Sequence, residues 1–132
     1  MITMKRLAGA VLVAVLLAPF VGLSAQTAFK RTMLQQGDIS VAGREAVMAR
    51  AEFPAGVASG KHTHPGEEVA YVLEGTVQLE VEGKAPVTLK AGDVFMIPVR
   101  KIHNATNTGT SVAKVVATYI VEKGQPLATP VQ

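Results

Sequence analysis

The sequence predicts an all-β protein of the sandwich or barrel type, and two observations lead to this prediction. From Arg44 onward, short segments rich in β-branched and apolar residues recur at regular spacing. Glycine-containing turns, such as Gly83-Lys84 and Lys90 to Asp93, separate these segments. Short strands with this spacing and this turn composition are typical of β-sandwiches and β-barrels.

The first 25 residues are expected to be a signal peptide and not part of the fold. A basic start at Lys5 and Arg6 precedes an apolar run from Leu7 to Ala18. Leu23-Ser24-Ala25 then offers a cleavage site before Gln26. An uncleaved membrane anchor is the alternative, because the apolar stretch is only slightly shorter than a membrane span. We expect export to the periplasm or secretion, with membrane contact only through this segment.

Residues 26–132 are expected to form a single domain with a modest core. Without Lys5 and Arg6, 11 basic residues face 10 acidic residues, so this domain is nearly neutral. It contains no basic stripe interleaved with aromatic residues, which argues against nucleic acid as a partner. The pairs Lys30-Arg31 and Arg100-Lys101 are isolated, and solvated positions are expected for both.

The first predicted strand runs from Arg44 to Phe53, and its residues alternate mildly between two faces. One face would carry Val47, Ala49, Ala51 and Phe53, and the other Met48, Arg50 and Glu52. If the face of Met48 lines the barrel, Arg50 could bind an anionic substrate through a bidentate ion pair. The alternative for Arg50 is an outward-facing charge on an edge strand.

Two further strands, Val69 to Leu73 and Thr76 to Glu82, are predicted on either side of the Glu74-Gly75 turn. The second alternates between apolar and polar residues, which indicates a half-buried strand. Tyr71 and Tyr119 could each supply a hydroxyl group to a ligand pocket, and Tyr71 is taken as a candidate substrate-binding residue. A core position with a satisfied hydroxyl is the alternative for both tyrosines.

Three more segments complete the predicted sheets. Val87 to Leu89 is a short strand, and Val94 to Ile97 is continuously apolar, so we expect it to be buried. Val112 to Val121 is rich in β-branched residues and is expected to be a last long strand. Gly124 to Gln132 contains two prolines and is expected to be a surface strap or a loose end.

All three histidines of the chain belong to one candidate metal site. On an extended segment His62 and His64 share a face, with Cα atoms roughly 6.5–7 Å apart. Two imidazoles at this spacing can converge on one ion through bonds of about 2.0–2.1 Å. Pro65-Gly66 then turns the chain and brings a carboxylate, Glu67 or Glu68, towards the same centre. This mixed ligand set suits a divalent first-row metal without selecting one.

Two spaced motifs resemble those of the cupin family. The first motif consists, in order, of Gly56, His62, His64, Glu68 and Gly75. The second consists, in order, of Gly92, Pro98, His103 and Asn107. The second departs from the family pattern at Arg100, where the motif usually has glycine. The glycines are expected to be turn residues that allow positive φ.

The resemblance implies a cupin jelly-roll barrel, also called a double-stranded β-helix, with its core motifs over residues 56–107. It also implies a bound divalent transition metal such as Fe, Mn, Ni, Cu or Zn. The ligands that it implies are His62, His64, Glu68 and His103. Glu67 lies one residue off the pattern and is expected to be a solvated carboxylate or a hydrogen-bond acceptor for a ligand side chain.

A site of three histidines and one glutamate resembles that of cupin dioxygenases, including quercetinases and oxalate-oxidising enzymes, and that of small sugar or uronate isomerases. The first hypothesis is therefore a metal-dependent enzyme that acts on a small organic molecule, with dioxygenase-type chemistry and Glu68 as the catalytic proton carrier. No second acid or base is present beside the implied ligands apart from Glu67, which disfavours isomerase chemistry. The few polar groups slightly favour an apolar or aromatic substrate.

Two alternatives to the enzyme remain. One is a periplasmic metal-containing protein that binds a small anionic ligand without catalysis. The other is a structural cupin whose metal only holds the barrel together. A homodimer is expected in each case, because small jelly rolls have exposed sheet edges that tend to be covered.

Overall fold

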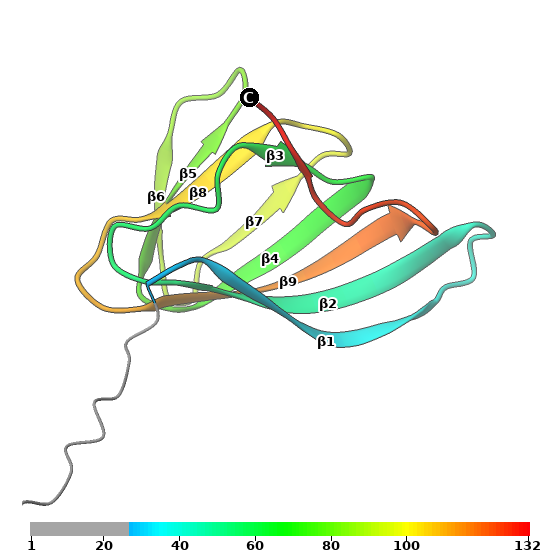
Figure 1. The fold of residues 1–132 in the computed structure, drawn as a ribbon, viewed down its shortest axis with the longest axis horizontal. Coiled ribbons are helices and arrows are strands. Elements are labelled where there is room, and N and C mark those ends of the chain that lie inside the picture. Colours follow the sequence, from blue (N-terminus) through cyan, green and yellow to red (C-terminus); the bar gives the residue numbers. More distant parts are fainter. Residues whose placement is uncertain (1–26) are drawn as a thin grey trace, which may run out of the picture.

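The computed structural model describes residues 27–132, which form two five-stranded antiparallel sheets (Figure 1). The all-β fold class and the jelly-roll architecture are confirmed. The expected signal peptide, residues 1–25, lies outside the described residues. Between residues 27 and 132 no helix is long and apolar enough to cross a membrane.

Ten strands make up the two sheets. Their bounds are β1 (Lys30–Asp38), β2 (Arg44–Phe53), β3 (His62–Thr63), β4 (Gly66–Glu74), β5 (Thr76–Val81), β6 (Val87–Lys90), β7 (Val94–Ile97), β8 (His103–Asn107), β9 (Ala113–Glu122) and β10 (Thr129–Pro130). The first sheet has the order β1-β2-β9-β4-β7, and the second has the order β10-β3-β8-β5-β6. Figure 1 shows the sheets as two layers that face each other, with the long strands β2, β4 and β9 in the lower layer.

The core lies between the two layers and takes every second residue of the long strands. Along β2 the predicted alternation is confirmed, because the face that carries Ala49 and Ala51 is buried while Met48 is exposed. Along β5 the apolar residues Val77 and Leu79 are likewise buried. Burial of one such side chain contributes about 1.5–3 kcal/mol to stability.

The turn between β4 and β5 carries the chain from one sheet to the other at Gly75. This glycine has a φ of 78°, a left-handed conformation that side chains disfavour. A Cβ atom at this position would also lie 2.9 Å from the Cα atom of Ala113. Gly75 is therefore required by both backbone conformation and space, and the prediction of a turn glycine is confirmed.

The prediction that Val94 to Ile97 is buried is wrong for half of the segment. Val94 and Met96 are 68% and 59% exposed, whereas Ile97 is buried. The physical reason is that the first sheet has only one face on the core, and the side chains of Val94 and Met96 lie on the other face. On the other face, Val69 of β4 lies opposite Met96 and Tyr71 lies opposite Val94, so the sheet has an apolar outer surface here.

Four strands were not predicted from the sequence: β1, β3, β8 and β10. Strands β3 and β10 have two residues each, too few for any periodicity to show. They pair with each other through Thr63–Thr129 and His62–Pro130, so residues 124–132 form a strap and not a loose end. Strand β1 is largely polar and exposed, and its register with β2 shifts between Met33 and Gln35.

Candidate metal centre

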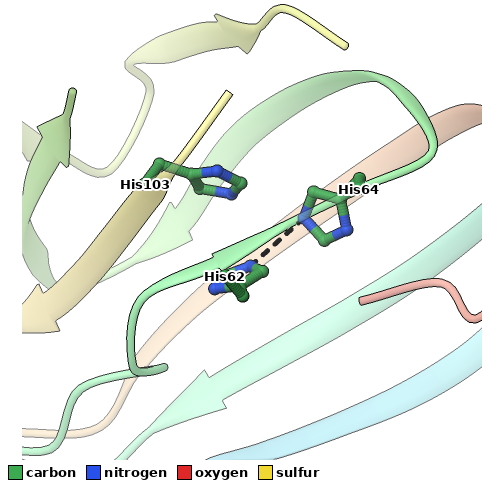
Figure 2. Close-up of side chains that lie close together, drawn as sticks. All are labelled: His62, His64 and His103. Atoms are coloured by element: carbon green, nitrogen blue, oxygen red, sulfur yellow. Dashed lines mark hydrogen bonds between the residues drawn. The ribbon is translucent and has the colours of Figure 1, made fainter. Parts of the chain in front are cut away.

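Three buried histidine side chains converge between the two sheets (Figure 2). His62 belongs to β3, His64 follows that strand directly, and His103 is the first residue of β8. The pairing of β3 with β8 places His62 directly opposite His103. Their ligand atoms all lie within 4.8 Å of one another, which is consistent with a transition-metal site.

Each imidazole ring is held by a backbone carbonyl through its Nδ1 atom. The three Nδ1–oxygen distances are 2.7 Å for His62 to Gly60, 2.6 Å for His64 to Leu127 and 2.8 Å for His103 to Lys101. A carbonyl oxygen can only accept a hydrogen bond, so each Nδ1 must carry the proton. In a neutral ring the Nε2 atom is then an unprotonated lone-pair donor, as a metal ligand requires.

These Nε2 atoms face one another inside the barrel. The Nε2 atoms of His62 and His64 are 3.2 Å apart, along the dashed line in Figure 2. The Nε2 atom of His103 is buried and has no hydrogen-bond partner. Lone pairs that face each other repel unless a proton or a cation lies between them. The arrangement is therefore unfavourable by itself and becomes favourable when a cation is bound.

Glu68 joins the same cluster from β4. Its Oε2 atom lies 3.1 Å from His64 Nε2 and 3.2 Å from His103 Nε2, and the side chain is buried. Burial alone would raise the pKa of Glu68, but the close contacts with His103 and His64 outweigh it and lower this pKa to about 2. The carboxylate is therefore ionised at neutral pH. Glu67, the preceding residue of β4, lies opposite Ile120 and is half-buried. Its side chain is on the other face of the strand from Glu68, away from the cluster.

The spacing of the four atoms suits a single ion. Ligand atoms about 2.1 Å from one metal are separated by about 3.0 Å at right angles and about 3.4 Å at the tetrahedral angle. The separations of 3.1–3.2 Å for His62–His64, His64–Glu68 and His103–Glu68 fall between these values. The donor set of imidazole nitrogens and one carboxylate oxygen is also chemically suitable for a first-row transition metal.

A proton is a poor substitute for the ion at His62. Burial, with a smaller effect of the neighbouring His103 and His64, lowers the pKa of His62 to about 4, against the effect of the Gly60 carbonyl. At neutral pH this ring is uncharged and its Nε2 lone pair is free. The site is thus prepared for a metal in the pH range in which most proteins work.

The cluster borders a cavity of about 30 Å³ inside the barrel. The cavity is lined mainly by apolar and aromatic side chains, together with His62, Glu68 and His103. Tyr119 closes one wall, with its ring centroid 4.6 Å from that of His64. The volume corresponds to about one or two water molecules. Without movement of the lining side chains, the cavity admits only very small ligands.

Arg31 also lines this cavity, and its expected solvated position is wrong. Strand pairing places Arg31 opposite Ala51, whose side chain is buried, so the two share the core-facing side of the sheet. The Nε atom of Arg31 is buried without a hydrogen-bond partner. The guanidinium carbon lies 5.2 Å from the ring centroid of Phe29 and 5.9 Å from that of Tyr119. Sequence reasoning missed this residue because β1 lacks an apolar alternation.

Arg50 and Tyr71 lie away from the histidine cluster. The expectation that they contact a ligand at this centre is wrong. Both side chains point to the outer face of the first sheet, because Ala51 and Ala70 beside them occupy the core-facing positions. Arg50 forms an ion pair of 3.6 Å with Glu52, and Tyr71 is 46% exposed. Neither residue can reach a ligand bound among the histidines.

Arg100 keeps the backbone shape that glycine usually provides in the second motif. It has a φ of 58°, in the left-handed region, and it is the one non-glycine residue between residues 27 and 132 with positive φ. Its backbone N–H donates to the carbonyl of His64 at 3.0 Å, and its side chain is exposed. The expectation that Arg100 is a solvated residue is thus confirmed, and its backbone takes the left-handed conformation that favours glycine.

Comparison with known families identifies one match. Residues 49–124 match the family profile described as the cupin domain, and this range contains both spaced motifs completely. An oxalate-binding protein from Thermotoga maritima is 36% identical over 76 residues, which cover 57% of this chain and 62% of that protein.

A plant protein is also similar in sequence, and a solved structure is similar in fold. Germin-like protein subfamily 2 member 2 from Arabidopsis thaliana is 35% identical over 77 residues, which cover 54% of this chain and 35% of that protein. The chain therefore matches only about a third of the length of this relative. An oxalate oxidase solved with the substrate analogue glycolate has a similar fold, with a TM-score of 0.65, 23% identity and coverage of 82% of this chain and 57% of that one.

Proposed function

The chain belongs to the cupin family, and from this we propose that it is a metal-dependent cupin that takes up a small organic molecule at a mononuclear metal site. The proposed ligands are His62, His64, Glu68 and His103. One observation carries the proposal: three Nε2 lone pairs meet because a backbone carbonyl holds each Nδ1 proton. The bound ion, one of Fe, Mn, Ni, Cu or Zn, would supply Lewis-acid chemistry.

The residues of the chain prepare the reaction in three ways. The histidines orient the site, the apolar lining keeps bulk water out, and Glu68 can hold or move a proton at its buried carboxylate. The small cavity and the presence of Arg31 favour a small, oxygen-rich ligand over the apolar or aromatic substrate expected from the sequence. The similarity to an oxalate-binding protein and to an oxalate oxidase supports the same ligand class.

Metal content is the direct test of the site. Protein purified from its native compartment should contain close to one equivalent of a transition metal by elemental analysis. Glu68→Gln keeps the shape of the side chain but removes its charge, and it should weaken metal binding by at least about 10-fold. Glu67→Gln is the matched control and should change the affinity little. The reverse order of effects would show that the carboxylate is wrongly assigned.

Oxygen uptake distinguishes an enzyme from a binding protein. The first candidate that we propose is dioxygenase-type chemistry. The metal-loaded protein should then consume O2 in proportion to the amount of a small organic acid that it converts, and Glu68→Gln should abolish this activity. A binding protein without catalysis is the second candidate, favoured by the relative that is an oxalate-binding protein. It would bind the same acid, seen as a change in the visible spectrum of a Co(II) form, without oxygen uptake. An isomerase would instead convert a sugar or uronate without O2.

Export is proposed for the leader segment, residues 1–25. If it directs export, the chain expressed with its own leader in a bacterium should be recovered from the periplasm or the medium. Mass spectrometry should then show an N-terminus close to Gln26. Recovery of uncleaved chain from the membrane fraction would favour the anchor instead.

A homodimer is proposed through the outer face of the first sheet. Val69, Tyr71, Val94 and Met96 form a contiguous patch there, each between 46% and 68% exposed. Exposed apolar patches of this kind are typical of protein interfaces. Sedimentation velocity should show a dimer, and Val69→Asp should convert it to a monomer without loss of metal. A monomeric wild-type protein at micromolar concentration would contradict this assignment.

A further inference from the structure

Arg31 differs from the other described arginines because its guanidinium group lies against the rings of Phe29 and Tyr119 and has no carboxylate or carbonyl partner. Arg44 donates to the Ile120 carbonyl, Arg50 pairs with Glu52, and Arg100 pairs with Glu122. No carboxylate among residues 27–132 lies within ion-pair distance of Arg31, and its Nε atom is buried without a hydrogen bond. Arg31 as a whole is half-buried, and a partly desolvated guanidinium group without a counter-charge is a favourable place for an anion to bind.

The unpartnered group shares its cavity with the metal centre. Arg31, His62, Glu68 and Tyr119 all line the same 30 Å³ space. Burial and the Glu68 carboxylate raise the pKa of the Tyr119 hydroxyl, while the Arg31 guanidinium opposes them. Strand pairing places Glu68 opposite Tyr119, and the Arg31 guanidinium carbon lies 5.9 Å from the Tyr119 ring centroid, so the guanidinium faces the same interior as the proposed ligands.

The charges of this interior do not balance once a metal is bound. The histidines are neutral, Glu68 contributes one negative charge, and a divalent ion together with Arg31 contributes three positive charges. Two positive charges then remain uncompensated in a space that is largely closed to water. A dianionic ligand would neutralise both.

We propose that Arg31 binds one carboxylate of a small dicarboxylate ligand, whose other oxygens coordinate the metal. The inference rests on the proposed metal site and specifies the class of ligand that this site takes. A guanidinium group presents two parallel N–H donors that match the two oxygens of a carboxylate. Because the cavity holds only about one or two water molecules, lining side chains must move even for oxalate, the smallest dicarboxylate, and they would have to move much further for sugars and aromatic molecules.

Oxalate binding to the Co(II)-loaded protein tests the role of Arg31. Binding is followed by calorimetry and by the visible spectrum of Co(II), at pH 8. Arg31→Met should raise the Kd for oxalate by about 10–100-fold, because two charge-assisted hydrogen bonds are lost. Arg31→Lys should give an intermediate Kd, since lysine keeps the charge but not the paired donors. The affinity for Co(II) itself should not fall in either variant.

Arg50→Met is the matched control, because it removes the same charge from the outer face of the neighbouring strand. It should leave the Kd for oxalate unchanged. Imidazole, a neutral metal ligand, should bind the wild-type and Arg31→Met proteins equally. Sulfate should bind much more weakly than oxalate, and equal binding would overturn the assignment to carboxylates.

The outcomes separate this inference from the metal proposal. Wild-type protein that binds no Co(II) would contradict the metal site itself. Wild-type protein that binds Co(II) but has the same Kd for oxalate as Arg31→Met would overturn only the role of Arg31. Circular dichroism of each variant confirms that the fold is intact before the Kd values are compared.

Discussion

The stability of the metal-free protein should fall on mild acidification because of His62. Burial lowers the pKa of His62 from 6.5 to about 4 in the folded protein, whereas the unfolded chain keeps the ordinary value. Between these two pH values the unfolded state binds more protons than the folded state, so stability decreases as the pH falls. The difference in pKa corresponds to about 3 kcal/mol, lost progressively below about pH 6.5.

Urea unfolding at a series of pH values measures this loss. Protein treated with a chelator would be unfolded at pH 7 and pH 4.5 and followed by circular dichroism. Glu68 does not interfere in this range, because its pKa is lowered from 4.5 to about 2 and its stabilising contribution is lost only below about pH 4.5. Added metal should stabilise the protein most at pH 7, by about 4 kcal/mol at a concentration 1,000 times Kd.

The His62→Asn variant is the control, since asparagine can still donate to the Gly60 carbonyl but does not titrate. It should lose much less stability than wild type between pH 7 and pH 4.5. A loss below about 1 kcal/mol in the wild-type protein would refute the argument for His62. An equal loss in both proteins would assign the effect to other groups.

Three further predictions concern the frame of the site. Gly66→Ala should destabilise the protein by about 3 kcal/mol or more in urea unfolding, because the added Cβ atom would overlap the Ile120 carbonyl. Arg100→Gly should raise the melting temperature by relieving about 0.5–1 kcal/mol of left-handed strain, whereas alanine there should not. Truncation before Leu127 should weaken Co(II) binding about 10–100-fold in a titration, because His64 loses the acceptor for its Nδ1 proton.

The histidine cluster was predictable because the information is local. His62, His64 and Glu68 lie within seven residues, and the alternation of an extended chain determines which way such side chains point. The same alternation predicted the buried face of β2. These are properties of neighbouring residues and can be read without knowledge of the tertiary structure.

Features that depend on pairing between distant strands were not predictable. Arg31 faces the core because of its register opposite Ala51, in a strand whose own sequence has no apolar period. Val94 and Met96 are exposed because they lie on the outer face of the first sheet, which an apolar run does not reveal. The acceptors of the three Nδ1 protons are backbone carbonyls, and a backbone carbonyl has no signature in the sequence.

The strap formed by residues 124–132 has a consequence for the kinetics of folding. The acceptor for His64 lies 63 residues further along the chain, and His62 meets His103 only when β3 pairs with β8. Contacts between such distant residues are slow to form, because a long loop must close first. A complete set of ligands is therefore absent until folding is nearly finished. Metal should then leave the folding rate almost unchanged and slow unfolding, so that the bound ion extends the lifetime of the native state.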